Sequence, residues 1–226
     1  MMTFRKILFS TLAAVALCSC GNDKELEIAD RGYFLYFCNR AVDEIKIQKT
    51  QTHEGLYDGL RVVVGTFPAD SPLLKGNSWM EQQVKEYVAP EDPDGKQFSG
   101  MMPIPINYTA EACESIKLLL YDHHDELLSD ITPMARFHYV IHEDHPSVFE
   151  KLEKAIFLFN SDKELLGRVE EGSTLVEYLA KRPMMFVCAL FTFPDLDTSL
   201  LQDGNHVKVE VRLANGTVLT ADTNEN

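Results

Sequence analysis

The sequence predicts a mainly β protein with a few short helices, in which antiparallel strands form a β-sandwich in the C-terminal half. Residues 207–213 alternate without a break between apolar and charged side chains, which is typical of a strand with one buried and one solvated face. Asn215-Gly216 follows this run and predicts a hairpin with a type I′ turn, in which both residues have positive φ. Short runs rich in β-branched and aromatic residues, separated by turn residues, recur along the rest of the chain.

The other expected strands follow from the same rules. Residues 33–38 form a continuous aromatic run, which suits a strand buried on both faces, and residues 60–67 are rich in valine and end at Pro68. Residues 41–49 alternate more loosely. The remaining strands are expected at residues 115–122, 135–142, 184–193 and 218–220.

Three capping boxes, in which Ser or Thr precedes Glu by three residues, predict helix starts. They begin at Ser78, Ser147 and Thr174. The first helix carries an apolar stripe that includes Trp79 and ends near Pro90, and the third is short because Pro183 follows. The second is expected to run into a strand at residues 156–159.

The turn at residues 91–95 and the Pro-, Gly- and Met-rich stretch up to residue 105 form the best candidate for a boundary or a long connection. This stretch separates a mixed β/α region at residues 32–100 from the β-rich region at residues 101–226. The alternating strand and hairpin at residues 207–220 resemble the closing hairpin of an immunoglobulin-like sandwich.

The N-terminus reads as a targeting segment. Arg5 and Lys6 precede an apolar run over residues 7–17, which is shorter than the about 20 residues needed to span a bilayer. It therefore indicates a signal peptide over residues 1–19 rather than a membrane helix.

The segment Leu17-Cys18-Ser19-Cys20 resembles the lipobox of bacterial lipoproteins. Leu17 and Ser19 fit Cys20 as the lipidated residue, whereas Cys18 is preceded by a bulky leucine and would be lost with the signal peptide. The acidic residues of the tether at 20–31 resemble the surface-export signal of lipoproteins in Bacteroidota-type bacteria. This resemblance implies a lipid-anchored protein of the outer membrane, on the cell surface or facing the periplasm.

The net charge of −14 excludes a nucleic-acid partner, since phosphates require basic surfaces. Loss of residues 1–19 removes two basic residues and no acidic residue, so the mature chain is more acidic still. Anionic lipid would repel it, and the acyl chains must therefore hold it at the membrane.

With Cys20 acylated, Cys38, Cys113 and Cys188 remain, an odd number that permits one disulfide at most. Cys38 and Cys188 lie in apolar runs, where a thiol behaves as a small buried hydrophobe. Buried free thiols are expected, and a disulfide or a nucleophilic cysteine is the alternative.

Five of the seven histidines lie between His123 and His145. Clusters at the ends of two expected strands could gather His123, His124, His142 and His145 with nearby carboxylates, which are suitable ligands for Zn²⁺. The spacing matches no known zinc motif, and a solvated loop is the simpler interpretation. A metal-binding protein or metal-dependent hydrolase is the alternative function.

The acidic loop at residues 195–205 offers oxygen ligands for Ca²⁺, although Leu200 and His206 occupy the EF-hand positions that require Gly and Glu. No nucleophile elbow, phosphate-binding glycine loop or Cys-x-x-Cys motif is present. The sequence therefore favours a non-enzymatic module without a cofactor, which binds a ligand, a glycan or an envelope protein, or which has a structural role.

Overall fold

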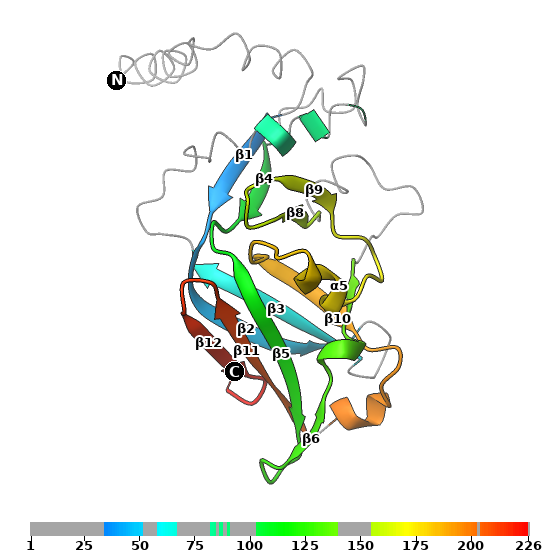
Figure 1. Cartoon of the computed structure of the whole chain (residues 1–226). Coiled ribbons are helices and arrows are strands. Elements are labelled where there is room, and N and C mark those ends of the chain that lie inside the picture. Colours follow the sequence, from blue (N-terminus) through cyan, green and yellow to red (C-terminus); the bar gives the residue numbers. More distant parts are fainter. Residues whose placement is uncertain are drawn as a thin grey trace, which may run out of the picture.

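The computed structural model describes residues 34–51, 58–66, 82–84, 86–87, 90, 103–139, 155–202 and 204–225, with the backbone alone at 34–39 and 103–106. Over these residues the protein is mainly β, with short helices and mostly antiparallel sheets, as the sequence predicts (Figure 1).

The first four-stranded sheet joins segments that lie far apart in the sequence. Its order is β2 (Ala41–Thr50), β3 (Gly59–Thr66), β10 (Cys188–Thr192) and β7 (Arg136–His138), and every neighbouring pair is antiparallel. Residues from both regions, 32–100 and 101–226, therefore build one sheet.

The second four-stranded sheet has the order β12 (Val218–Asp222), β11 (His206–Leu213), β5 (Cys113–Tyr121) and β6 (Leu127–Asp130), again antiparallel throughout. In β11 the residues Val207, Val209, Val211 and Leu213 are buried, which confirms the alternation read from the sequence. β6 and β12 form the two edges of this sheet.

Both four-stranded sheets contribute to one hydrophobic core. The side chains of Leu60 and Val62 from the first sheet and of Leu118 and Val209 from the second belong to the same buried cluster. At its centre the Phe137 ring lies 4.8 Å from Phe191, 5.3 Å from Tyr178 and 6.1 Å from Phe186, centroid to centroid.

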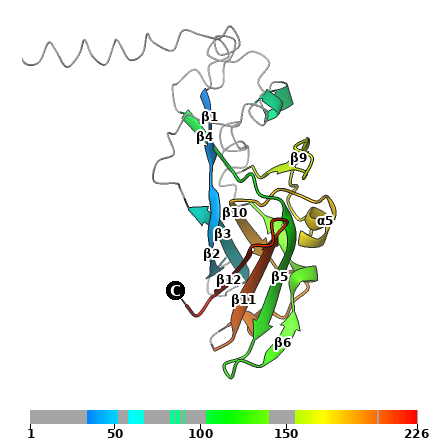
Figure 2. The same ribbon diagram turned by 60° about the vertical axis from the view of Figure 1, so that its left-hand side comes forward.

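The smaller elements lie around this core. β1 (Phe34–Asn39) pairs in parallel with β4 (Pro103–Tyr108), and β8 (Phe157–Phe159) pairs with β9 (Leu165–Arg168). Figures 1 and 2 show β1 and β4 at one end of the molecule and β6 at the opposite end. The short helical elements are η2 (Thr132–Met134), α5 (Leu175–Ala180) and η3 (Thr198–Leu201).

The capping box predicted at Thr174 is confirmed. The Thr174 hydroxyl accepts a hydrogen bond from the Glu177 backbone N–H at 3.1 Å, and the Glu177 carboxylate accepts one from the Thr174 backbone N–H at 2.8 Å. Helical residues also occur at 82–84 and 86–87, within the first expected helix. Trp79 and the caps at Ser78 and Ser147 lie outside the described residues.

Three expected elements differ from the structure. The strand expected at residues 184–193 is shorter, β10, because residues 184–187 are buried without pairing as a continuous strand. The strand expected at 135–142 is confined to β7 within the described residues. The stretch expected to be a connection up to residue 105 contains the start of β4, whose hydrogen-bonding partner β1 is distant in the sequence.

The predicted type I′ turn at Asn215-Gly216 is wrong. Gly216 has φ of 88°, but Asn215 is not among the residues with positive φ. The Gly216 N–H donates to the Leu213 carbonyl, and the Leu213 N–H donates to the Thr217 carbonyl, each at 2.9 Å. This is a three-residue loop with a glycine bulge, which joins the same two strands.

Candidate functional site

The two described histidines of the sequence-predicted cluster lie in the β5–β6 turn (residues 122–126). His123 and His124 are exposed, and their ring centroids are 3.8 Å apart. The Asp122 carboxylate accepts hydrogen bonds from the backbone N–H groups of His124 at 2.8 Å and Glu126 at 2.9 Å. Asp122 therefore shapes the turn that carries the histidines.

The same contacts act on the charge of Asp122. The hydrogen bond from the Glu126 backbone lowers the pKa of Asp122, and the hydrogen bond from the His124 backbone lowers it further against partial desolvation. These hydrogen bonds therefore favour the ionised form of the Asp122 carboxylate.

A second polar group, which no sequence pattern predicts, lies beside this turn and is centred on His206. His206 is buried, and its Nε2 lies 3.0 Å from Asp125 Oδ1 and 3.5 Å from Asp222 Oδ2. Its ring stacks on Tyr121 with centroids 5.5 Å apart. The alternation of β11 places His206 on the same face as Lys208, so the sequence pattern predicts exposure. In the structure His206 is buried beside Tyr121, Asp125 and Asp222.

Lys208 of β11 forms an ion pair with Asp125 of the same polar group. Its Nζ lies 2.8 Å from Asp125 Oδ1 and 4.6 Å from the centre of the Tyr121 ring. The hydrogen bond from Lys208 lowers the pKa of Asp125, and the hydrogen bond to Asp125 raises the pKa of Lys208. The pair therefore ties the β5–β6 turn to β11 through an ionic contact at an exposed site.

The predicted zinc site is not assembled within the described part of the chain. No group of three or more His, Cys, Asp and Glu side chains there could hold a metal ion. His142 and His145 lie outside the described residues, so the complete four-histidine set stays a prediction. His138, the other described histidine between residues 123 and 145, has a different contact: its Nδ1 lies 2.8 Å from Glu171 Oε1.

The residues of the possible Ca²⁺ loop have other contacts. The Asp195 carboxylate pairs with Arg136 at 2.9 Å. The Asp197 carboxylate accepts the Ser199 backbone N–H at 3.0 Å at the start of η3. Asp203 lies outside the described residues. These two carboxylates therefore stabilise local structure.

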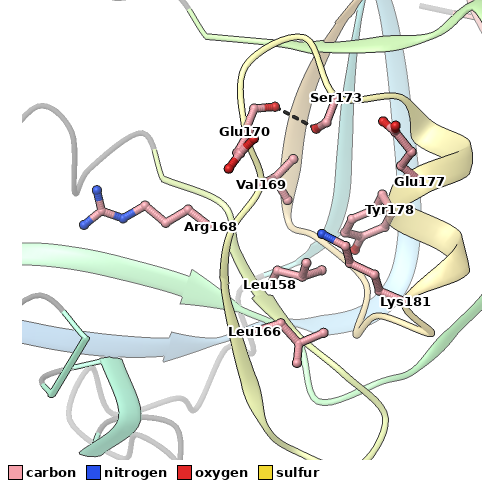
Figure 3. Close-up of a pocket in the computed structure, with 9 residues that line it drawn as sticks. All are labelled: Leu158, Leu166, Arg168, Val169, Glu170, Ser173, Glu177, Tyr178 and Lys181. Atoms are coloured by element: carbon pink, nitrogen blue, oxygen red, sulfur yellow. Dashed lines mark hydrogen bonds between the residues drawn. The ribbon is translucent and has the colours of Figure 1, made fainter.

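A pocket of about 330 Å³ lies between β8, β9 and α5 (Figure 3), at the lower end of the range for small-molecule sites. Its lining residues are Leu158, Leu166, Arg168, Val169, Glu170, Ser173, Glu177, Tyr178 and Lys181.

The polar groups of this pocket are mostly engaged in the fold. Glu177 caps α5, and the buried Tyr178 hydroxyl donates to the Met184 carbonyl at 2.5 Å. Figure 3 shows Arg168 pointing away from the other lining side chains. Its guanidinium lies 5.4 Å from the centre of the Tyr87 ring and 5.6 Å from that of Phe157. The apolar lining of the pocket comes from Leu158, Leu166 and Val169. The charged lining residues do not point towards a common site in the pocket.

The two described cysteine side chains differ in burial. Cys113 is a free, buried thiol, and burial raises its pKa to about 12. Cys188 is free but exposed, contrary to the expectation of burial, because its side chain lies on the outer face of β10. The Cys38 side chain and Cys20 are not among the described parts of the chain.

No helix in the described ranges is both long and apolar enough to cross a membrane. Comparison of the chain with protein-family models, curated proteins and solved structures finds no match.

Proposed function

We propose that this chain is a lipid-anchored protein of the bacterial cell envelope, whose immunoglobulin-like β-sandwich binds a partner molecule without catalysing a reaction. The strand order carries the proposal. A constant-type immunoglobulin domain has one sheet of strands A, B, E and D and another containing G, F and C.

Labelling the strands of the two four-stranded sheets in chain order gives a similar arrangement with one additional strand. With β2, β3, β5, β6, β7, β10, β11 and β12 taken as A, B, C, C′, D, E, F and G, the first sheet reads A-B-E-D and the second reads G-F-C-C′. One core shared by both sheets also supports the sandwich. In this scheme β1 and β4 belong to the connection between B and C, and β8, β9 and α5 to that between D and E.

The anchor is supported by the lipobox-like segment that ends at Cys20. From Cys20 the tether leads towards β1, which begins at Phe34. Because β1 and β6 lie at opposite ends of the molecule (Figure 2), an anchored chain would present the β6 end away from its attachment point. Such a geometry suits a binding module on the envelope.

The non-catalytic assignment is supported by what the described polar groups do. Asp122 and Asp197 hold backbone turns, Glu177 caps a helix, and Asp125 pairs with Lys208. Each of these carboxylates has a contact that stabilises the fold, which is the ordinary role of such residues in a binding scaffold.

The anchor is tested by metabolic labelling with palmitate in a bacterial host. We expect label in the wild type and in Cys18→Ala, its matched control, and none in Cys20→Ala. Label that persists in Cys20→Ala, or a wild type without label, would overturn the anchor. The sandwich is tested separately by NMR contacts between the paired strands β3 and β10, and β5 and β11, whose absence would contradict the strand order.

Metal binding through the histidine-rich region is the second candidate, and the proximity of His123 and His124 favours it. Elemental analysis after purification in metal-poor buffer tests it, together with a thermal melt in EDTA. Stoichiometric zinc that is lost in a His124→Ala/His142→Ala variant would support this function. A metal-free protein whose melt is unchanged by EDTA would exclude it.

A further inference from the structure

The edge strand β6 exposes two adjacent large apolar side chains, whereas the edge strands β12 and β9 expose one each, Val218 and Leu166. Among the described strands, β6 hydrogen-bonds to β5 alone and forms one margin of its sheet. Leu127 is 57% exposed and Leu128 is 47% exposed. The register against β5 shifts between the pair of Ser129 with Leu120 and that of Leu127 with Tyr121, so Leu128 has no partner residue in β5, and the two leucines form an exposed apolar stretch at the start of this edge strand.

An edge strand presents unpaired backbone groups that can template another strand. Hydrogen-bonding directions alternate along a regular antiparallel strand, so one of the two residues that pair in regular register, Ser129 and Asp130, directs its N–H and C=O away from β5. Figure 2 shows β6 at the margin of the molecule, with β5 on one side and no labelled strand on the other.

The remaining edges are less available. β7 has three residues, and its Arg136 and His138 side chains pair with Asp195 and Glu171. β2 carries charged residues, among them the Lys46–Glu44 ion pair, and charges protect an edge from pairing. β12 lies against β2 along the opposite side of the sandwich.

The charge around β6 indicates what could pair with it. The segment 122–130 contains the acidic residues Asp122, Asp125, Glu126 and Asp130 and no lysine or arginine. Asp125 is neutralised by Lys208, whereas Glu126 and Asp130 are exposed. A partner segment with positively charged side chains would therefore complement the charge of this edge.

We propose that the free edge of β6 binds an extended segment of a basic partner protein by strand addition, so that backbone pairing supplies affinity and Glu126 and Asp130 select flanking lysine or arginine. This assignment rests on the binding function proposed above and names the class of its partner. A second copy of the chain is a poorer occupant, because it would bring the same acidic residues and a net charge of −14 to the interface. Main-chain pairing with pockets for alternate side chains is an established mode of peptide recognition.

The test uses the mature lipidated chain in nanodiscs of phosphatidylcholine, a zwitterionic lipid. The probe is a blocked peptide of alternating valine and threonine with two lysines at each end. Its controls replace the lysines by glutamates, or the central residue by proline. Hydrogen–deuterium exchange then locates the bound peptide, because amides that gain a partner in a sheet exchange more slowly.

We expect the basic peptide, and neither control peptide, to slow exchange over residues 127–130. Leu128→Lys should weaken the dissociation constant at least about tenfold, because it adds a cation and removes apolar contact at the edge. The matched variant Val218→Lys changes an exposed residue at the other edge of the same sheet, and it should leave the affinity unchanged. Glu126→Gln/Asp130→Asn should weaken binding of the basic peptide and make that binding less sensitive to salt.

Slowed exchange at β12 or around the pocket instead of β6 would overturn the edge assignment and leave the binding module standing. Equal binding of the acidic peptide, or no slowing in any segment, would also overturn it. Protection of β6 that grows with protein concentration without peptide would assign the edge to a second copy. The palmitate and cross-strand experiments report on the proposed function independently.

Discussion

At the scale of single residues, the surroundings of a side chain decide its chemistry more than its neighbours in sequence do. Cys188 lies in an apolar run and Cys113 lies between Glu111 and Glu114, yet the Cys113 thiol is buried and the Cys188 thiol faces solvent. Burial against the core disfavours the thiolate of Cys113, with the nearby charge of Glu114 adding to the effect.

We therefore predict that Cys188 reacts with a thiol reagent in the native protein and that Cys113 reacts only after unfolding. The thiolate is the reactive form, and with a pKa of about 12 Cys113 is almost entirely protonated at neutral pH. The measurement is mass spectrometry after labelling, in a Cys38→Ser background. Native labelling of Cys113 as fast as that of Cys188 would contradict the burial seen here.

The contact between Asp125 and Lys208 predicts how stability depends on pH. The folded-state pKa of Asp125 is lowered by Lys208, so its contribution is present above the ordinary aspartate pKa of about 3.9 and is lost as pH falls through the lower folded value. The pKa of Lys208 is raised by Asp125, so the same contribution is present below about pH 10.4 and is lost as pH rises through the folded value.

Accordingly, Asp125→Asn should be less stable than the wild type near neutral pH, and the difference should vanish in strong acid and in strong base. Urea unfolding across the pH range measures it. Glu126→Gln is the control, because that neighbouring exposed carboxylate makes no described contact with Lys208. A difference that persists unchanged in acid would show that charge is not its cause.

At the scale of elements, short-range patterns predict most strands, but the geometry of their junctions depends on close approaches. Gly65 near the end of β3 has φ of 82°, and a Cβ built there would lie 2.2 Å from the backbone oxygen of Ala41 in β2. This approach coincides with the irregular register between Ala41 and Ile45.

We predict that Gly65→Ala destabilises the protein clearly more than Gly216→Ala. Both sites have positive φ, which costs a non-glycine residue about 1–2 kcal/mol, but a Cβ at Gly216 meets no atom within 4 Å. The excess loss at Gly65 should come from the clash with Ala41, since a backbone oxygen cannot rotate away. Thermal melts of both variants measure the effect, and equal losses would contradict the close approach.

At the scale of the whole molecule, the core depends on rings contributed by distant segments. Phe137 from β7 packs against Tyr178 of α5, against Phe191 of β10, and against Phe186, which precedes β10. Removing the Phe137 ring would leave a cavity that could be filled only if β10 and α5 moved towards each other.

We predict that Phe137→Ala lowers the free energy of unfolding by about 3–5 kcal/mol. Val176→Ala on α5, where the side chain is 50% exposed, should change it by no more than about 0.5 kcal/mol. Chemical denaturation with two spectroscopic probes is the measurement. A small loss for Phe137→Ala would contradict the tight packing of this ring against Tyr178, Phe186 and Phe191.

The sequence by itself determined the mainly β class, the alternation of β11 and the capping box of α5, because each depends on residues within a few positions of one another. The lipobox at Cys20 is equally local, and the anchor it implies stays a prediction. Only the tertiary structure decided that β3 pairs with β10, that His206 is buried under the β5–β6 turn, that Cys188 is exposed, and that β6 has a free edge. These features arise from hydrogen bonds and packing between segments that lie far apart in the sequence, as β3 and β10 do. Such contacts leave no period in the sequence that a local pattern could reveal.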